Sequence, residues 1–149
     1  MPRRASLTAG PILAPALLLT ACSTPVPVPN VTPEGPARHT CLRLADRLPD
    51  RVGDGERRDT RPGGPFSAAW GDPPIVLRCG VTAPAALSPT SELVSVNRVD
   101  WFAERLPRGY RFTTVGLPAR IEVRVPAAYA PEVNPLVDLA PAIRSASGG

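Results

Sequence analysis

Lysine is absent from this chain of 149 residues, so every one of its 17 basic residues is an arginine. The protein therefore cannot form a Schiff base, and it has no lysine to act as a general base or phosphate clamp. His39 is the only histidine, which excludes sites built from several imidazoles. We expect His39 to cap or flank a helix, and we expect no metal and no cofactor.

Catalytic and nucleotide-binding motifs are also missing. No serine lies in a Gly-x-Ser-x-Gly or Ser-x-x-Lys pattern, and neither a phosphate loop nor a dinucleotide fingerprint is present. No nucleic-acid partner is expected, because the arginines of residues 53–65 are matched by as many acidic residues. We predict that this polar, glycine-rich segment is a solvated loop. Its charged residues are Arg57, Arg58 and Arg61 against Asp54, Glu56 and Asp59.

The first 21 residues have the pattern of a lipoprotein signal peptide. Arg3 and Arg4 precede an apolar run over residues 7–19, which is too short for a membrane span and contains two prolines. Residues 19–22 (Leu-Thr-Ala-Cys) resemble the bacterial lipobox, in which the cysteine receives a diacylglycerol and the chain is cut before it. We predict lipidation of Cys22 with palmitate-type chains. The alternatives are an ordinary secretory signal with a chance cysteine and, for the route, twin-arginine export.

Residues 22–37 comprise the lipidated cysteine and a proline-rich segment. Five prolines lie in residues 23–37, which favours polyproline II over packing. We predict a semi-rigid tether that holds the domain roughly 45 Å from the lipid, at about 3.1 Å per residue. The alternative is a proline-rich recognition ligand.

Two cysteines, Cys41 and Cys79, remain for a disulfide in an exported chain. Closing this loop would stabilise the fold by roughly 4 kcal/mol. The alternative is two buried, reduced thiols.

The apolar periodicity predicts one α+β domain over residues 38–145, with a frayed tail at residues 146–149. A helix begins with Thr40 as its N-cap, carries Cys41 on its apolar stripe and ends before Pro49. Ile75, Leu77 and Cys79 share one face of a strand, so we expect the helix to pack on this strand. The fold class is a mainly antiparallel sheet of four to five strands, with one or two helices packed on one face.

The remaining elements follow from alternation and turn residues. Asn97 and Arg98 form a poor hairpin turn that we expect to be lengthened. Residues 103–111 are predicted to be a loop, and Pro141 is expected to kink or split the last helix, which starts at Asn134. The other predicted strands are residues 66–70, 93–96, 99–102, 112–115 and 119–125.

Aromatic residues are few, and their one concentration suggests a ligand surface. Trp101 and Phe102 are adjacent, so on a strand they point to opposite faces. The surface would combine the exposed one of the two with Arg108 or Arg111. The alternative is that residues 103–111 cover this aromatic side chain.

Three carboxylates, Asp72, Asp100 and Glu104, lie near these aromatic residues, and Asp72 or Asp100 is the candidate for acid–base hydrolysis. Asp72 lies in a Gly-Asp-Pro turn, where aspartate is favoured for backbone reasons.

The chain resembles an actinobacterial lipoprotein family described as domain of unknown function 3515, over about residues 40–143. Arg98 departs from the glycine expected in its turn. The resemblance implies an exported, membrane-attached protein and brings no catalytic residues. It rests on the lipobox, Cys41 with Leu44 and Leu48-Pro49, Arg57-Arg58, and residues 69–75 (Ala-Trp-Gly-Asp-Pro-Pro-Ile), 77–81 (Leu-Arg-Cys-Gly-Val), 99–102 (Val-Asp-Trp-Phe) and 123–126 (Val-Arg-Val-Pro).

Together these observations predict a lipid-anchored envelope protein on the extracytoplasmic face of the cell membrane. Its expected role is non-catalytic binding or scaffolding, with an envelope protein or glycan as partner. The alternative is a cell-wall or lipid hydrolase that uses Asp72 or Asp100.

Overall fold

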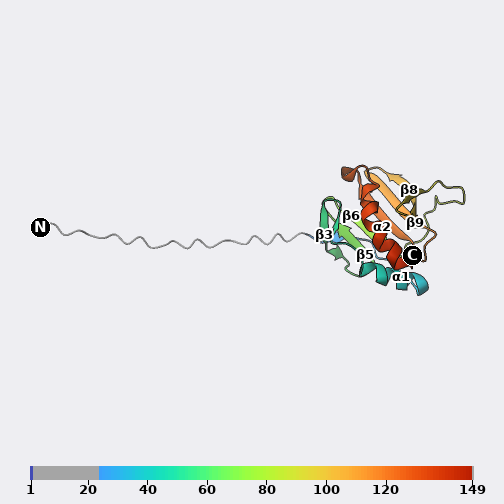
Figure 1. Cartoon of the computed structure of the whole chain (residues 1–149), viewed down its shortest axis with the longest axis horizontal. Coiled ribbons are helices and arrows are strands. Elements are labelled where there is room, and N and C mark those ends of the chain that lie inside the picture. The colour runs from blue at the N-terminus through green and yellow to red at the C-terminus, as the bar shows by residue number, and fades with distance from the viewer. Residues whose placement is uncertain (2–23, 149) are drawn as a thin grey trace.

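A computed structural model describes Met1 and residues 24–148 of the chain. Two helices lie on one face of a large sheet (Figure 1). In chain order the elements are β1 (Val26–Pro27), α1 (Gly35–Ala45), β2 (Arg51–Val52), β3 (Gly55–Arg58), β4 (Thr60–Arg61), β5 (Ser67–Trp70), β6 (Ile75–Cys79), β7 (Val94–Val96), β8 (Val99–Leu106), β9 (Gly109–Val115), β10 (Ile121–Pro126), the 3-10 helix η1 (Ala127–Tyr129) and α2 (Asn134–Ser147).

The main sheet has eight strands in the order β2-β3-β5-β6-β10-β9-β8-β7, and all neighbours in it are antiparallel. A separate two-stranded sheet pairs β1 with β4 in parallel. The predicted α+β class and antiparallel pairing are confirmed. The predicted number of four to five strands was too low.

The missing strands come from residues 51–61, part of which we expected to form a solvated loop. Charged residues are poor strand formers, so the pattern of this segment gave no signal. Arg57 nevertheless pairs with Trp70 of β5 and lies over its ring, 5.0 Å from Cζ to the ring centroid. Burial lowers the pKa of Arg57, although Asp50 acts against this. Arg57 therefore pairs within the sheet through its backbone and covers the ring of Trp70 with its side chain.

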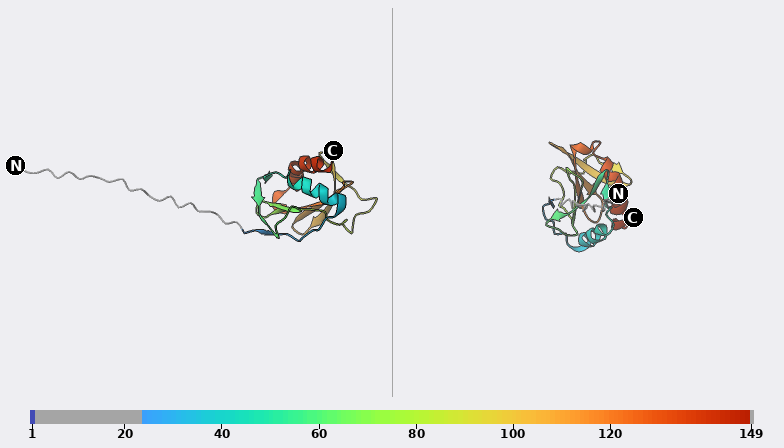
Figure 2. Two further views of the ribbon diagram at one scale, coloured as in Figure 1. Left: turned by 90° about the horizontal axis from the view of Figure 1, so that it is seen from below. Right: turned by 90° about the vertical axis from the view of Figure 1, so that its left-hand side faces the viewer.

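Alternation along the central strands divides the sheet into two faces. Ile75, Leu77 and Cys79 are buried on the core face, under the helices. Figure 2 (left) shows both helices on this side of the sheet. Trp70 is fully buried there and donates its indole N–H to the carbonyl of Pro49 at 2.9 Å. We call the opposite side of the sheet the outer face.

Cys41 and Cys79 form a disulfide that joins α1 to β6. Both cysteines are buried in the main core. The predicted pairing and the packing of the first helix on this strand are confirmed.

Both helices differ from their predicted form. Helix α1 begins at Gly35, five residues before the predicted N-cap Thr40, because Pro36 suits the first turn of a helix. Thr40 is buried inside α1 and accepts a hydrogen bond from Arg43. Helix α2 runs unbroken through Pro141, which is exposed, and reaches Ser147. The predicted split into two helices was wrong.

The predicted frayed tail was wrong as well over its described part. Ala146 is fully buried in the main core, and Gly148 ends α2 in a left-handed conformation. Apolar burial therefore holds the last turn of the helix in place.

Residues 103–111, which we expected to be a loop, instead form the centre of a long hairpin. Strand β8 runs to Leu106 and β9 starts at Gly109, so two residues make the turn. The β7–β8 turn is also short, because Asn97 and Arg98 both adopt positive φ, at 48° and 66°. The longer turn that we expected from Arg98 was therefore wrong.

The proline-rich segment is not a free tether where the structure describes it. Residues 24–34, which we call the strap, lie along the outer face of the sheet, as Figure 2 (left) shows. Val26 and Val28 are buried against Ala69 and Val76. The valines between the prolines make apolar contacts with the sheet, and a prediction based on the number of prolines did not consider these contacts.

Candidate functional site

The two candidate catalytic carboxylates lie at opposite ends of the sheet. Asp72 follows Trp70, which pairs with the first residue of β6. Asp100 pairs with Val115, at the sheet end where β6 finishes. Three strands separate β5 from β8, which is four steps of about 4.8 Å, or roughly 19 Å. Paired glycosidase carboxylates lie within about 10 Å of each other, so these two cannot act together.

Each of the two carboxylates has a simple structural setting. Asp72 is highly exposed in the β5–β6 turn and lies 3.8 Å from Arg58. Next to it, the Tyr129 hydroxyl donates a hydrogen bond to the carbonyl of Pro73 at 2.9 Å. Burial raises the pKa of Tyr129, and the charge of Asp72 raises it further. Asp100 is exposed at the start of β8.

The structure divides the predicted ligand surface among three places. Trp101 is fully buried in the core, whereas Phe102 is half-buried on the outer face. Arg111 shares the outer face with Phe102, while Arg108 lies in the β8–β9 turn. A ligand role for Phe102 and Arg111 stays a prediction, whereas Trp101 is not accessible.

The outer face carries two ion-pair groups in adjacent rows. Glu122 accepts hydrogen bonds from Arg78 on β6 and Arg124 on its own strand, at 3.0 Å each. In the next row Arg111 donates two hydrogen bonds to Glu104, at 2.7 and 2.8 Å. These hydrogen bonds raise the pKa of Arg111.

The charges of these two ion-pair groups are therefore satisfied within the sheet. Arg124 and Arg111 stand directly opposite each other, and their repulsion is offset by the carboxylates beside them. The side chain of Glu122 is only 8% exposed, so its two guanidinium partners balance a nearly buried charge. Chemically, these two groups form an ionic platform in which no acid or base is free, whereas Asp100 at the end of this face has no ion-pair partner among the described residues.

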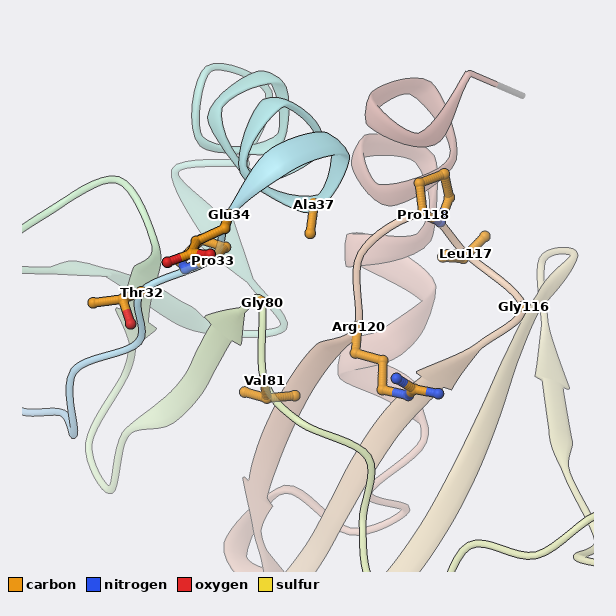
Figure 3. Close-up of a pocket in the computed structure, with 10 residues that line it drawn as sticks. All are labelled: Thr32, Pro33, Glu34, Ala37, Gly80, Val81, Gly116, Leu117, Pro118 and Arg120. Atoms are coloured by element: carbon orange, nitrogen blue, oxygen red, sulfur yellow. The ribbon is translucent and has the colours of Figure 1, made fainter.

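A depression of about 470 Å³ lies at the end of the domain where β6 finishes (Figure 3). We call this end the distal end. Three segments form the walls of the depression: residues 32–37, residues 80–81 and residues 116–120. In Figure 3 the side chain of Glu34 points away from Arg120, so the acid does not neutralise the arginine.

A second depression, of about 350 Å³, lies on the other side of residues 116–118. It is lined by Arg98 from the β7–β8 turn and by Arg144 and Ser147 from α2. Among the described residues, Arg98, Arg120 and Arg144 form no ion pair, and Arg144 donates one hydrogen bond to the carbonyl of Asn97 at 3.3 Å. The two depressions thus place three uncompensated arginines around one short loop.

Sequence reasoning missed this arginine group as a site. Arg98, Arg120 and Arg144 come from segments that no spacing rule connects. The one available signal was Arg98, which occupies a turn position that favours glycine.

Neither a metal centre nor a membrane span is found in the part of the chain that the structure describes. No three His, Cys, Asp or Glu side chains gather there as ligands. No helix among the same residues is both long and apolar enough to cross a membrane. Cys22, the predicted lipidation site, lies outside the described residues.

Comparison with known proteins identifies the family. A family model described as "Protein of unknown function (DUF3515)" matches residues 5–148. No curated protein and no solved structure matches the chain. Because the family match covers nearly the whole sequence, the chain belongs to the DUF3515 family.

Proposed function

We propose that the protein is an exported lipoprotein that is anchored through Cys22 and binds an anionic component of the cell envelope. It acts on the extracytoplasmic face of the cell membrane. Its binding surface is the distal end, around residues 116–118, and the protein has no catalytic role.

The disulfide supports export. Disulfides form and persist in oxidising compartments outside the cytoplasm. Cys41 and Cys79 pair with each other, which leaves Cys22 as the one remaining cysteine of the chain. The family match begins at residue 5, so it includes both the apolar segment and Cys22. These features are consistent with a signal peptide that ends at a lipidated cysteine.

The uncompensated arginines are the observation that carries the binding proposal. Arg98, Arg120 and Arg144 line the two adjacent depressions and have no carboxylate partner among the described residues. Guanidinium groups bind carboxylates and phosphates through paired hydrogen bonds. A ligand rich in such groups, whether an acidic glycan or an acidic protein segment, fits this surface.

The hydrolase alternative has less support. Its two candidate carboxylates lie too far apart to act together, and Asp72 has the setting of a turn residue. Exchange of each for asparagine tests the alternative directly. We expect folded Asp72→Asn and Asp100→Asn variants to restore the wild-type phenotype when each is expressed in a deletion strain. A folded variant that does not restore it would favour the hydrolase.

The anchor is tested by Cys22→Ala. We expect the wild-type protein to sediment with membranes and the variant to remain in the soluble fraction of the envelope. Continued membrane attachment of the variant would contradict lipidation at this residue.

The binding surface is tested by a photo-crosslinking amino acid at Leu117, which lines both depressions. In intact cells we expect an adduct that is lost when Arg98, Arg120 and Arg144 are changed to glutamine. The matched control changes three exposed arginines elsewhere, Arg61, Arg105 and Arg108, and should keep the adduct. Digestion of the adduct with a protease or a glycan hydrolase separates the two ligand sources. An adduct that survives the first triple substitution would contradict the proposal.

A further inference from the structure

We infer that the lipidated protein lies directly on the membrane, with one defined end against the lipid headgroups and the distal end pointing away. This inference rests on the lipid anchor proposed above. The end that faces the lipid, which we call the proximal end, consists of the β2–β3 turn, the β5–β6 turn and η1. Tyr129 of η1 contacts Pro73 of the β5–β6 turn, and it lines one depression together with Gly53 and Asp54 of the β2–β3 turn.

The strap is fixed to the domain from its first described residues. Val26 and Val28 donate backbone hydrogen bonds to the carbonyls of Asp59 and Arg61, at 2.8 and 2.9 Å. These two residues are only 5% and 4% exposed, so the apolar contact with the outer face is nearly complete. The strap therefore forms part of the sheet packing and has little freedom to extend as a stalk.

The start of the strap is held at the proximal end. One guanidinium nitrogen of Arg58 donates to the carbonyl of Thr24 at 2.8 Å, and the other donates to the carbonyl of Gly71 at 3.0 Å. Arg58 thus connects the first described residue of the strap to the β5–β6 turn. The chain leaves the domain at this point toward Cys22.

The other end of the strap is held at the distal end. Pro33 is buried against Gly80, the residue after β6, where a Cβ atom would collide with the proline ring. The strap therefore spans the outer face along β6, from the proximal end to the depression shown in Figure 3.

The length of chain before the strap sets the distance to the membrane. Only one residue, Ser23, lies between Cys22 and Thr24, and the two residue-to-residue steps from Cys22 to Thr24 reach at most about 7 Å when extended. A free tether of the predicted length would reach roughly 45 Å. The acyl chains on Cys22 therefore bring the proximal end to the level of the headgroups.

Charge does not explain this contact, because both signs of charge are present at the proximal end. Asp54 and Asp72 are exposed there, and so is Arg51, which donates to the carbonyl of Asp54. Arg108, whose carbonyl accepts a hydrogen bond from Ala127 of η1, is exposed there as well. Attraction to anionic lipid is therefore not required, and the orientation should be the same on uncharged phosphatidylcholine vesicles.

The absence of lysine allows a direct test. The full lipidated chain is purified from membranes and reconstituted in phosphatidylcholine vesicles that contain a lipid with a spin-labelled headgroup. Two single variants each carry one lysine, whose amine is the only side-chain amine of the protein and is labelled with a fluorophore. These variants are Asp54→Lys at the proximal end and Ala86→Lys in the loop after β6. The labelled lysine-free protein gives the background from the α-amine. We expect severalfold stronger quenching at position 54 than at position 86.

A spacer variant supplies the matched control without touching a packed residue. Twelve Gly/Ser residues inserted between Ser23 and Thr24 add a reach of about 20 Å, at 5–6 Å per square root of length. We expect this variant to float with the vesicles as before and to lose most of the quenching at position 54. A second variant, Val26→Asp with Val28→Asp, should release the strap and give the same loss.

The outcomes separate this inference from the anchor itself. A wild-type protein that does not float with vesicles would overturn the anchor, and the orientation with it. Flotation with equal quenching at the two positions would overturn the orientation alone. An unchanged difference between the positions in the spacer variant would overturn the role of the short connection.

Discussion

At the scale of single residues, buried charge is tolerated only where hydrogen bonds surround it. Glu122 is the clearest case, since it lies between Arg78 and Arg124 on the outer face. Its position in the sequence predicted a solvated residue, because the β10 strand alternates cleanly between apolar and charged side chains. Side chains on the neighbouring strands bury Glu122 instead, and alternation within one strand does not predict which side chains those are.

We predict that Glu122→Gln destabilises the protein by about 3 kcal/mol, because it leaves the largely buried guanidinium of Arg78 without a counter-charge. The measurement is urea unfolding with the disulfide intact. Glu56→Gln is the control, since the Arg51–Glu56 pair is exposed and should contribute less than about 1 kcal/mol. Equal effects of the two substitutions would contradict the buried network.

Tyr129 gives a prediction on alkaline stability. Its pKa is raised in the folded protein, first by burial and then by the charge of Asp72. Between the unfolded and folded pKa values the native state therefore binds more protons than the unfolded chain. The contribution of this group is present below about pH 10, the ordinary tyrosine pKa, and is lost as the pH rises through the higher folded value.

We expect the unfolding free energy of the wild type to fall more steeply above pH 10 than that of Tyr129→Phe. Unfolding curves between pH 8 and pH 11.5 check this, at about half-unit steps chosen to bracket the ordinary tyrosine pKa. Asp72→Asn should lower the pKa of Tyr129 in an ultraviolet titration of the folded protein. Parallel pH profiles for the wild type and Tyr129→Phe would count against the shift.

At the scale of elements, the central strands could be predicted and the short edges could not. Strand β6 has its predicted bounds, because its apolar residues alternate and Pro73 and Pro74 precede it. Strands β2 to β4 escaped prediction because they hold two to four residues each and are rich in charge. The strap was misread for a related reason, since its pairing partners lie more than thirty residues away.

Gly80 tests how firmly the strap is held. Gly80 and Gly116 both have positive φ, at 90° and 78°, so alanine costs about 1–2 kcal/mol of backbone strain at either position. At Gly80 the new Cβ would also lie 2.9 Å from the Cγ atom of Pro33, whereas nothing lies within 4 Å at Gly116. We predict that Gly80→Ala costs about 1–3 kcal/mol more than Gly116→Ala in denaturant unfolding. Equal losses of unfolding free energy for the two variants would indicate that the strap moves away from Gly80 without an energetic cost.

At the scale of the whole molecule, the disulfide joins the helical layer to the sheet. It could be predicted because each cysteine lies on the apolar side of its own element. The group of Arg98, Arg120 and Arg144 could not be predicted, because only the complete fold brings a hairpin turn, a loop and the last helix together. Sequence patterns report local periodicity, and this candidate site is made of tertiary contacts.

We predict that reduction of the disulfide lowers the unfolding free energy by about 4 kcal/mol, since the bridge spans 38 residues. Urea unfolding of the Cys22→Ala protein, with and without reductant, measures the difference. Thiol titration of the same denatured protein should find no free thiol before reduction and two after it. Two thiols before reduction would refute the bridge in the mature protein.

The strap also sets an order of events for the export that we propose. Its first residues would emerge from a translocating chain before their partners, because Val26 and Val28 pack on Ala69 and Val76. The strap can therefore dock only after about fifty further residues have followed. For the proposed lipoprotein, this delay leaves processing and acylation a period of free access to the chain, which docking of the strap then closes. Maturation of such a lipoprotein would in that sense be timed by its own folding.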